Sequence, residues 1–222
     1  IGPGTMNRLL AAGVTLDQIN CICLSHFHLD HSGELAPFLF ALQNWEFACR
    51  PKLAITGGPG LKSFLAKLFD LYGSSIALGE QELAVYEAAG GDSIDFGWGK
   101  IRTAAMNHKP ESLAYRFCDA QESSLTISGD TDQTPNLAEL AQHSDIFICE
   151  AAMPDDRKTA GHLTPKLAGA IAKQAKVKTL VLTHFYPPVN MDDARKAVKD
   201  AGFKGELVLA SDLMQLAPDG NP

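Results

Sequence analysis

Short apolar runs alternate with amphipathic stretches along most of the 222-residue chain. A short apolar run between turn residues is typical of a buried strand, whereas apolar residues at a 3.6-residue period are typical of a helix. The runs predict strands over residues 19–26, 52–56, 124–130, 145–151, 179–185 and 206–211. The periodic stretches predict helices over residues 5–13, 33–44, 61–72, 135–143, 164–176 and 191–201.

Residues 93–119 follow a different pattern, because apolar and polar side chains occupy alternate positions there. Such alternation predicts antiparallel strands. Together with the strand–helix order elsewhere, it predicts an α/β protein with mixed sheets. No internal repeat or linker interrupts the pattern, so we expect a single domain over residues 1–222.

Capping residues predict where three of the helices begin. Thr5, Ser32 and Thr164 each stand at the start of a periodic stretch, where a hydroxyl side chain favours the N-cap position. Pro165 follows Thr164, and proline is favoured at the first helical position. The start at residue 164 is therefore the best defined of the three.

Composition narrows the class of protein. The chain is 45% hydrophobic and 20% charged, and no run of about eighteen apolar residues or signal-peptide pattern occurs. We therefore expect a cytoplasmic protein with no membrane partner. The net charge of −7 argues against a surface built to wrap nucleic acid. A local basic stretch from Arg157 to Lys178 is interpreted as a solvated helix face.

The five cysteines are odd in number and lie mostly in apolar runs, so we expect reduced thiols rather than a disulfide framework. They are Cys21, Cys23, Cys49, Cys118 and Cys149.

Residues 24–33, LSHFHLDHSG, carry the clearest candidate chemistry. Four polar residues of metal-binding type, His26, His28, Asp30 and His31, occupy six positions directly after a predicted strand. Burying several imidazoles and a carboxylate is costly unless something binds them. The cluster therefore predicts a metal site.

Three further candidate ligands lie where predicted strands end, namely His108, Asp130 and His184. A strand end is a rigid platform that can direct a side chain into a cleft. Imidazole and carboxylate ligands without thiolate suit Zn²⁺, with Mn²⁺ or Fe²⁺ as alternatives. Seven ligands are too many for one tetrahedral ion, and they predict two divalent ions about 3.5–4 Å apart.

The motif His-x-His-x-Asp-His, followed by a later His, the GDT aspartate and the THF histidine, resembles that of the metallo-β-lactamase superfamily. The resemblance covers nearly the whole chain. It implies an αββα sandwich of two mixed sheets flanked by helices, with the metals at one rim. It also implies that one metal is held by His26, His28 and His108, the other by Asp30, His31 and His184, and that Asp130 bridges both.

Within that superfamily, the stretches TGGPGLKSFLAKLF, CEAA and GHLTP resemble the ribonuclease Z and phosphodiesterase branch. The resemblance implies that His162 approaches the scissile phosphate and that Glu150 orients it. His162 also precedes a predicted helix N-terminus, which favours anions. A loop histidine that caps the helix is the alternative role for His162.

This resemblance leads us to expect metal-assisted hydrolysis of a phosphodiester. Asp30 is then expected to accept a proton from the nucleophile, and His162, held by Glu150, to stabilise the phosphate or protonate the leaving group.

The chain departs from the ribonuclease Z pattern in three places. Only 21 residues separate His108 from Asp130, so the arm that grips tRNA is absent, and Cys149 replaces a histidine. The chain also opens at IGPG, which resembles the turn after the first strands of the family, so we expect those strands to be missing. We therefore expect a small phosphodiester or nucleotide-like substrate, with RNA less favoured and a homodimer left open.

Two other functions remain open. One is hydrolysis of a thioester or lactone, as in glyoxalase II relatives, because the same dinuclear centre serves those reactions. The other is a non-catalytic descendant that binds metal or nucleic acid.

Overall fold

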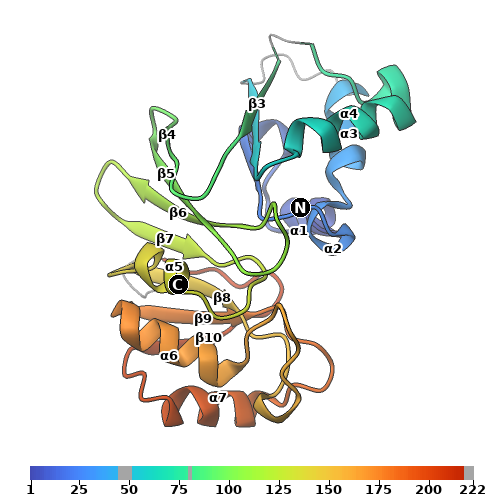
Figure 1. The fold of residues 1–222 in the computed structure, drawn as a ribbon. Coiled ribbons are helices and arrows are strands. Elements are labelled where there is room, and N and C mark those ends of the chain that lie inside the picture. Colours follow the sequence, from blue (N-terminus) through green and yellow to red (C-terminus); the bar gives the residue numbers. More distant parts are fainter. Residues whose placement is uncertain (45–51, 80–81, 218–222) are drawn as a thin grey trace. The chain divides into compact units, whose positions relative to one another are not determined.

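The computed structural model describes residues 1–44, 52–79 and 82–217, so that Cys49 lies outside the described residues. Contacts divide the chain into two compact units, Ile1–Ala88 and Ala89–Pro222. Figure 1 shows the elements of each unit along the chain. This division does not test the expected single domain, which stays a prediction.

The first unit contains a parallel sheet with helices in its connections. Its described strands form a three-stranded sheet in the order β1-β2-β3. Parallel neighbours need crossover connections, and helices supply them here. The elements are α1 (Thr5–Ala11), β1 (Cys21–Leu24), α2 (Leu29–Ser32), α3 (Leu35–Asn44), β2 (Leu53–Gly57), α4 (Leu61–Tyr72) and β3 (Leu83–Glu87), with 3₁₀ turns at Leu16–Gln18 and Gly73–Ser75.

The second unit contains a mixed sheet. Its described strands are ordered β10-β9-β8-β7-β6-β5-β4, antiparallel from β4 to β7 and parallel from β7 to β10. Helix α6 contacts β8 and β9 and packs on α7. The elements are β4 (Ser93–Asp95), β5 (Gly99–Ala105), β6 (Leu113–Asp119), β7 (Ser124–Ile127), α5 (Pro135–Leu140), β8 (Ile146–Glu150), α6 (Pro165–Ala175), β9 (Thr179–Thr183), α7 (Met191–Asp200) and β10 (Glu206–Leu209), with a 3₁₀ turn at Asp155–Arg157.

Each unit has its own hydrophobic core. In the first, Leu24, Phe38 and Ile55 are fully buried. In the second, Phe147 and Leu182 are fully buried between the sheet and its helices. Buried side chains of this size supply most of the stabilisation of a domain and hold the strand ends in fixed positions.

The predicted α/β fold with two sheets and flanking helices is confirmed, with one difference in detail. The described strands of the first sheet are all parallel, so only the second sheet is mixed. Strand β3 was not predicted from the sequence, and its residues are half-buried or exposed rather than fully buried.

Two of the three predicted helix caps are wrong. Gly4, with φ of 88°, caps α1, and Thr5 is its first helical residue. Ser32 lies inside the short helix α2, where its hydroxyl donates to the carbonyls of Phe27 and His28. The prediction at Thr164 is confirmed, because its side chain accepts from the Leu167 amide and Pro165 opens α6.

No helix in the described part of the chain is long and apolar enough to span a membrane. The cytoplasmic location stays a prediction.

Candidate metal centre

Asp130 is the central carboxylate of the second unit. It follows β7 and is 2% exposed. Its Oδ2 lies 4.0 Å from His108 Nε2 and its Oδ1 lies 3.6 Å from His184 Nε2. These distances are too long for hydrogen bonds. They match two ligands that share an ion, because each would lie about 2.0–2.2 Å from it.

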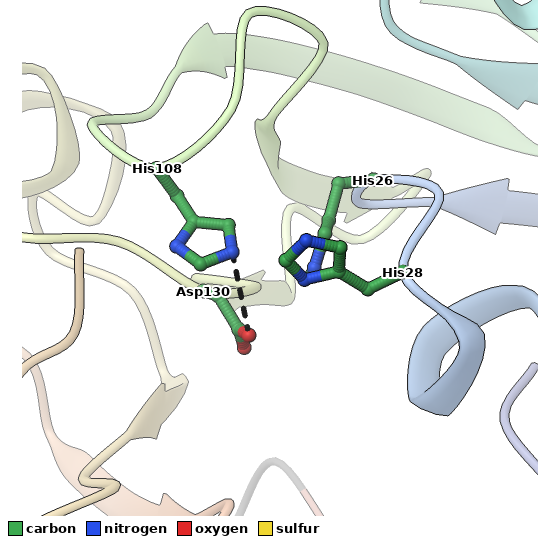
Figure 2. A group of neighbouring side chains, drawn as sticks. All are labelled: His26, His28, His108 and Asp130. Carbon is green, nitrogen blue, oxygen red and sulfur yellow. Dashed lines mark ion pairs between the residues drawn. The ribbon is translucent and has the colours of Figure 1, made fainter.

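Figure 2 shows the His108 ring directed toward the Asp130 carboxylate. His108 is held by its other nitrogen, since Nδ1 lies 2.9 Å from the Gly161 carbonyl oxygen. A carbonyl only accepts, so Nδ1 carries the proton and Nε2 keeps its lone pair. Such second contacts orient the histidine ligands of metal sites.

His184 follows β9, and its backbone is unusual. Its φ of 61° lies in the left-handed region, which residues other than glycine rarely adopt. This conformation costs roughly 1–3 kcal/mol and is found most often at functional sites. The ring stacks on His162, with centroids 5.6 Å apart, and its edge meets Tyr186 at 5.4 Å.

His162 and Glu150 form a pair beside Asp130. His162 Nδ1 lies 3.1 Å from Glu150 Oε1 and 3.9 Å from Asp130 Oδ2. The Glu150 carboxylate, 2% exposed, also accepts from the Thr131 and Ala152 amides. These two amides hold the Glu150 carboxylate in place against the Nδ1 side of the His162 ring.

The second unit therefore brings together every site residue predicted within it. One ligand atom each from Asp130, His162 and His184 lies within 4.8 Å of the others. His162 is consequently placed where it could contact either a metal or a bound substrate.

The first unit brings together the four residues of the opening cluster. The His26 ring lies 4.6 Å from that of His28 and 4.2 Å from that of His31, between centroids. Asp30 Oδ2 lies 3.4 Å from His31 Nε2. Figure 2 shows His26 and His28 on the segment that follows β1.

Local hydrogen bonds shape this cluster. The Ser25 hydroxyl lies 3.2 Å from His26 Nδ1 and 3.5 Å from His31 Nδ1. The Ser32 hydroxyl in α2 donates hydrogen bonds to the carbonyls of Phe27 and His28. These bonds fix the segment from β1 into α2 that carries the four residues.

The donor set in both units fits a divalent ion, since it consists of imidazole nitrogens and carboxylate oxygens. Within the described ranges, no thiol belongs to the candidate metal-binding groups. Cys21 and Cys23 contact each other at 3.8 Å between their Sγ atoms. Burial, reinforced by the Glu150 charge, raises the pKa of the Cys149 thiol, which therefore stays protonated.

Sequence reasoning missed the residues that support the site. Asp132 and Gly161 hold the His162 loop, and Tyr186 lies against two of the histidines. The Gly-His pair before a predicted helix was the one sequence signal that pointed to Gly161. Nothing in the local pattern singled out Asp132, which reads as a turn residue.

Comparison with known proteins places the chain in a family. A model described as a β-lactamase superfamily domain matches residues 2–185. The chain therefore belongs to the metallo-β-lactamase superfamily, a class in keeping with its two-sheet α/β fold and its histidine–aspartate clusters.

Its relatives include ribonuclease Z. The enzyme of that name from Streptomyces avermitilis is 28% identical over 262 residues, which cover 97% of this chain and 85% of the relative. Mb1374, an uncharacterized protein of Mycobacterium bovis, is 33% identical over 187 residues, covering 83% of this chain and 68% of that protein. The metallo-β-lactamase fold protein YhfI from Bacillus subtilis shares the fold, with a TM-score of 0.81 at 23% identity and coverage of 96% and 83%.

Proposed function

We propose that this protein is a metal-dependent phosphodiesterase with a dinuclear centre. The observation that carries the proposal is the position of Asp130, whose two carboxylate oxygens face two different imidazoles, His108 and His184. A carboxylate that serves two ions is typical of two-metal hydrolase sites. Following the family resemblance, we assign His26, His28 and His108 to one ion, Asp30, His31 and His184 to the other, and Asp130 to both.

When bound, the two ions, which we propose to be Zn²⁺, with Mn²⁺ and Fe²⁺ as alternatives, supply positive charge for the phosphate oxygens and lower the pKa of a water molecule. The Asp30 side chain is 56% exposed, so it is accessible to accept a proton from the attacking water. Asp130 is buried and keeps its role as a ligand.

His162 favours a phosphodiester over a thioester or lactone. A phosphodiester has a charged centre and an alkoxide leaving group, and both benefit from a nearby imidazole with a proton to give. Glu150 holds His162 Nδ1, and we assign Nε2 to the leaving oxygen. Hydrolysis of a thioester needs less help, because a thiolate leaves without protonation. A lactone also releases an alkoxide, but its carbonyl group lacks the charge of a phosphodiester, so it gains less from the imidazole.

The substrate that we propose is a small phosphodiester or a nucleotide-like molecule. The ribonuclease Z relatives make RNA the second candidate substrate, although the net charge of −7 disfavours an extended RNA-binding surface.

The test is a substrate panel on the purified chain loaded with Zn²⁺ or Mn²⁺. We expect turnover of bis-p-nitrophenyl phosphate that is abolished by a chelator and restored by the metal. A thioester and a β-lactam are the comparison substrates. Faster thioester turnover would favour the glyoxalase II-type alternative, and metal binding without any turnover would favour a non-catalytic descendant.

A matched control is available in the described part of the chain. His143 is exposed on the loop after α5 and is not a proposed ligand. Its φ of 55° is tolerated by asparagine, so His143→Asn removes one imidazole without added strain. This variant should keep wild-type activity and metal content.

A further inference from the structure

Asp132 connects three segments of the second unit. Its backbone amide donates to the Asn107 carbonyl at 2.8 Å, within an isolated antiparallel bridge beside His108. Its carboxylate Oδ2 accepts from Lys158 Nζ at 2.7 Å and from the Gly161 amide at 3.1 Å. One carboxylate oxygen therefore binds both ends of the loop that leads to His162.

That loop is short and closed on itself. The His162 amide donates to the Thr159 carbonyl at 3.2 Å, and Lys158 and Gly161 are both tied to Asp132. The Gly161 carbonyl in turn accepts from His108 Nδ1 at 2.9 Å. Asp132, Gly161, His108 and Asn107 thus form a ring of contacts in which each neighbour fixes the next.

We infer that Asp132 is a positioning residue that aims His162 at the leaving group, an inference that rests on the proposed phosphodiesterase function. Glu150 sets which nitrogen of His162 faces outward, but it contacts only the ring. The backbone beneath that ring is set by Asp132 through Gly161. Loss of the Asp132 carboxylate should therefore misplace the His162 Nε2 atom. The His162 imidazole and the Glu150 carboxylate themselves are both retained in such a variant.

The step concerned is the departure of the alcohol. Water oxygen bonds to phosphorus and passes one proton to Asp30, the bond from phosphorus to the leaving oxygen breaks, and that oxygen takes the proton from His162 Nε2. The products are a phosphomonoester and an alcohol. A leaving group that is already stable as an anion does not need this proton, so the contribution of His162 depends on the leaving group.

The test compares Asp132→Ala with wild type on a series of methyl aryl phosphodiesters, from p-nitrophenol to unsubstituted phenol. We expect kcat to fall about 10-fold to 100-fold for phenol, because a small misplacement of a catalytic group has effects of that size. For p-nitrophenol we expect little change, with KM and metal content unaltered. Asp132→Asn keeps an oxygen that can accept from the Gly161 amide and should restore the wild-type dependence on the leaving group.

A second readout does not depend on activity. Hydrogen exchange of the Gly161 and His162 amides should be at least about fivefold faster in Asp132→Ala, because the Gly161 hydrogen bond is lost. Lys178→Met is the matched control, since Lys178 forms a comparable ion pair with Asp145, 2.6 Å long, with no contact to this loop. It should leave both amides and the leaving-group series unchanged.

Equal losses for all leaving groups, or loss of metal in Asp132→Ala, would overturn the positioning role. Unchanged exchange at Gly161 would overturn it as well. If wild type with bound metal hydrolyses none of the diesters, the proposed function fails instead, and the exchange data still decide whether Asp132 holds the loop.

Discussion

At the scale of single residues, hydrogen bonds decide which nitrogen two histidines of the second unit, His108 and His162, present. His108 gives its Nδ1 proton to the Gly161 carbonyl, and His162 turns Nδ1 to Glu150. Both rings therefore present Nε2, yet their surroundings differ. His108 Nε2 faces Asp130, as a ligand would, whereas the Nε2 atom of His162 is not directed to Glu150. The same residue type can thus serve as ligand and as proton donor.

This difference predicts that two substitutions have distinct effects. His162→Ala should reduce turnover of a phosphodiester with a poor leaving group by about 10²–10⁴, the usual contribution of a general acid, and leave the metal in place. Asp130→Ala should remove metal, because a carboxylate with two facing imidazoles is lost. Steady-state kinetics and elemental analysis of the purified variants measure the two effects. Equal loss of metal in both variants would contradict the division of roles.

At the scale of elements, the sequence predicted helices well where the periodic pattern was long, or where two adjacent residues both favoured the start of a helix. Helix α4 lies over residues 61–72 as predicted, and Thr164 with Pro165 begins α6. The caps at Thr5 and Ser32 failed for a physical reason. In both places the hydroxyl donates to a nearby carbonyl instead of accepting from the first turn. A pattern of residue types does not reveal which of these two bonds a hydroxyl makes.

Gly161, in the loop before α6, is constrained both by its backbone conformation and by the space around its Cα atom. These two constraints yield a prediction. Its φ is +82°, and an added Cβ would lie 2.9 Å from His108 Nδ1. Gly97 has nearly the same φ, +81°, with no atom within 4 Å of such a Cβ. Both alanine variants should lose about 1–2 kcal/mol of unfolding free energy through backbone strain. Only Gly161→Ala should also displace His108.

Urea denaturation and metal titration of the two glycine variants separate these effects. Metal affinity should fall in Gly161→Ala and stay at the wild-type level in Gly97→Ala. A matching fall in both variants would mean that strain alone, rather than contact with His108, weakens the site.

The junction of β7, β8 and β9 yields a prediction about acid stability. Burial raises the pKa of the Asp145 carboxyl, but the Lys178 ammonium and the bonds from Ser124 outweigh it, so the pKa lies below its ordinary value. A carboxyl whose folded pKa is lowered stabilises the fold above its unfolded pKa, and this contribution is lost as the pH falls through the folded pKa.

Asp145→Asn should therefore cost about 1–3 kcal/mol of unfolding free energy at pH 7, the usual value for hydrogen bonds to a charged group. The difference from wild type should start to shrink as the pH falls below about 4, because the unfolded wild type then begins to bind a proton at Asp145. It should vanish once the pH lies below the lowered folded pKa, where Asp145 is protonated in both states. Urea denaturation across this range measures it. A difference that stays constant down to about pH 2 would show that the charge of Asp145 is not responsible.

At the scale of the whole molecule, the candidate ligands are spread over most of the chain, from His26 to His184. The sequence predicted them because strand ends are recognisable and because the motif order resembles a family. The sequence could not predict the hydrogen bonds that hold these ligands in position. Asp132 and Gly161 act through backbone contacts between segments that are 29 residues apart in the chain. Such contacts depend on the tertiary structure and have no local signature.

The proposed ligands, which run from His26 to His184 along the chain, predict that metal binding stabilises the fold. At free metal about 100 times its Kd, one bound ion adds about 2.7 kcal/mol to the unfolding free energy. For a chain of this length, that corresponds to a rise in Tm of about 5–10 °C. Thermal unfolding of the chelated protein and of the protein reloaded with Zn²⁺ measures the rise. His28→Ala in the first unit and His184→Ala in the second should each reduce it, whereas His143→Asn should not. If the full rise persists in either alanine variant, the histidine removed is not a metal ligand, because the loss of a ligand must lower the affinity for the ion.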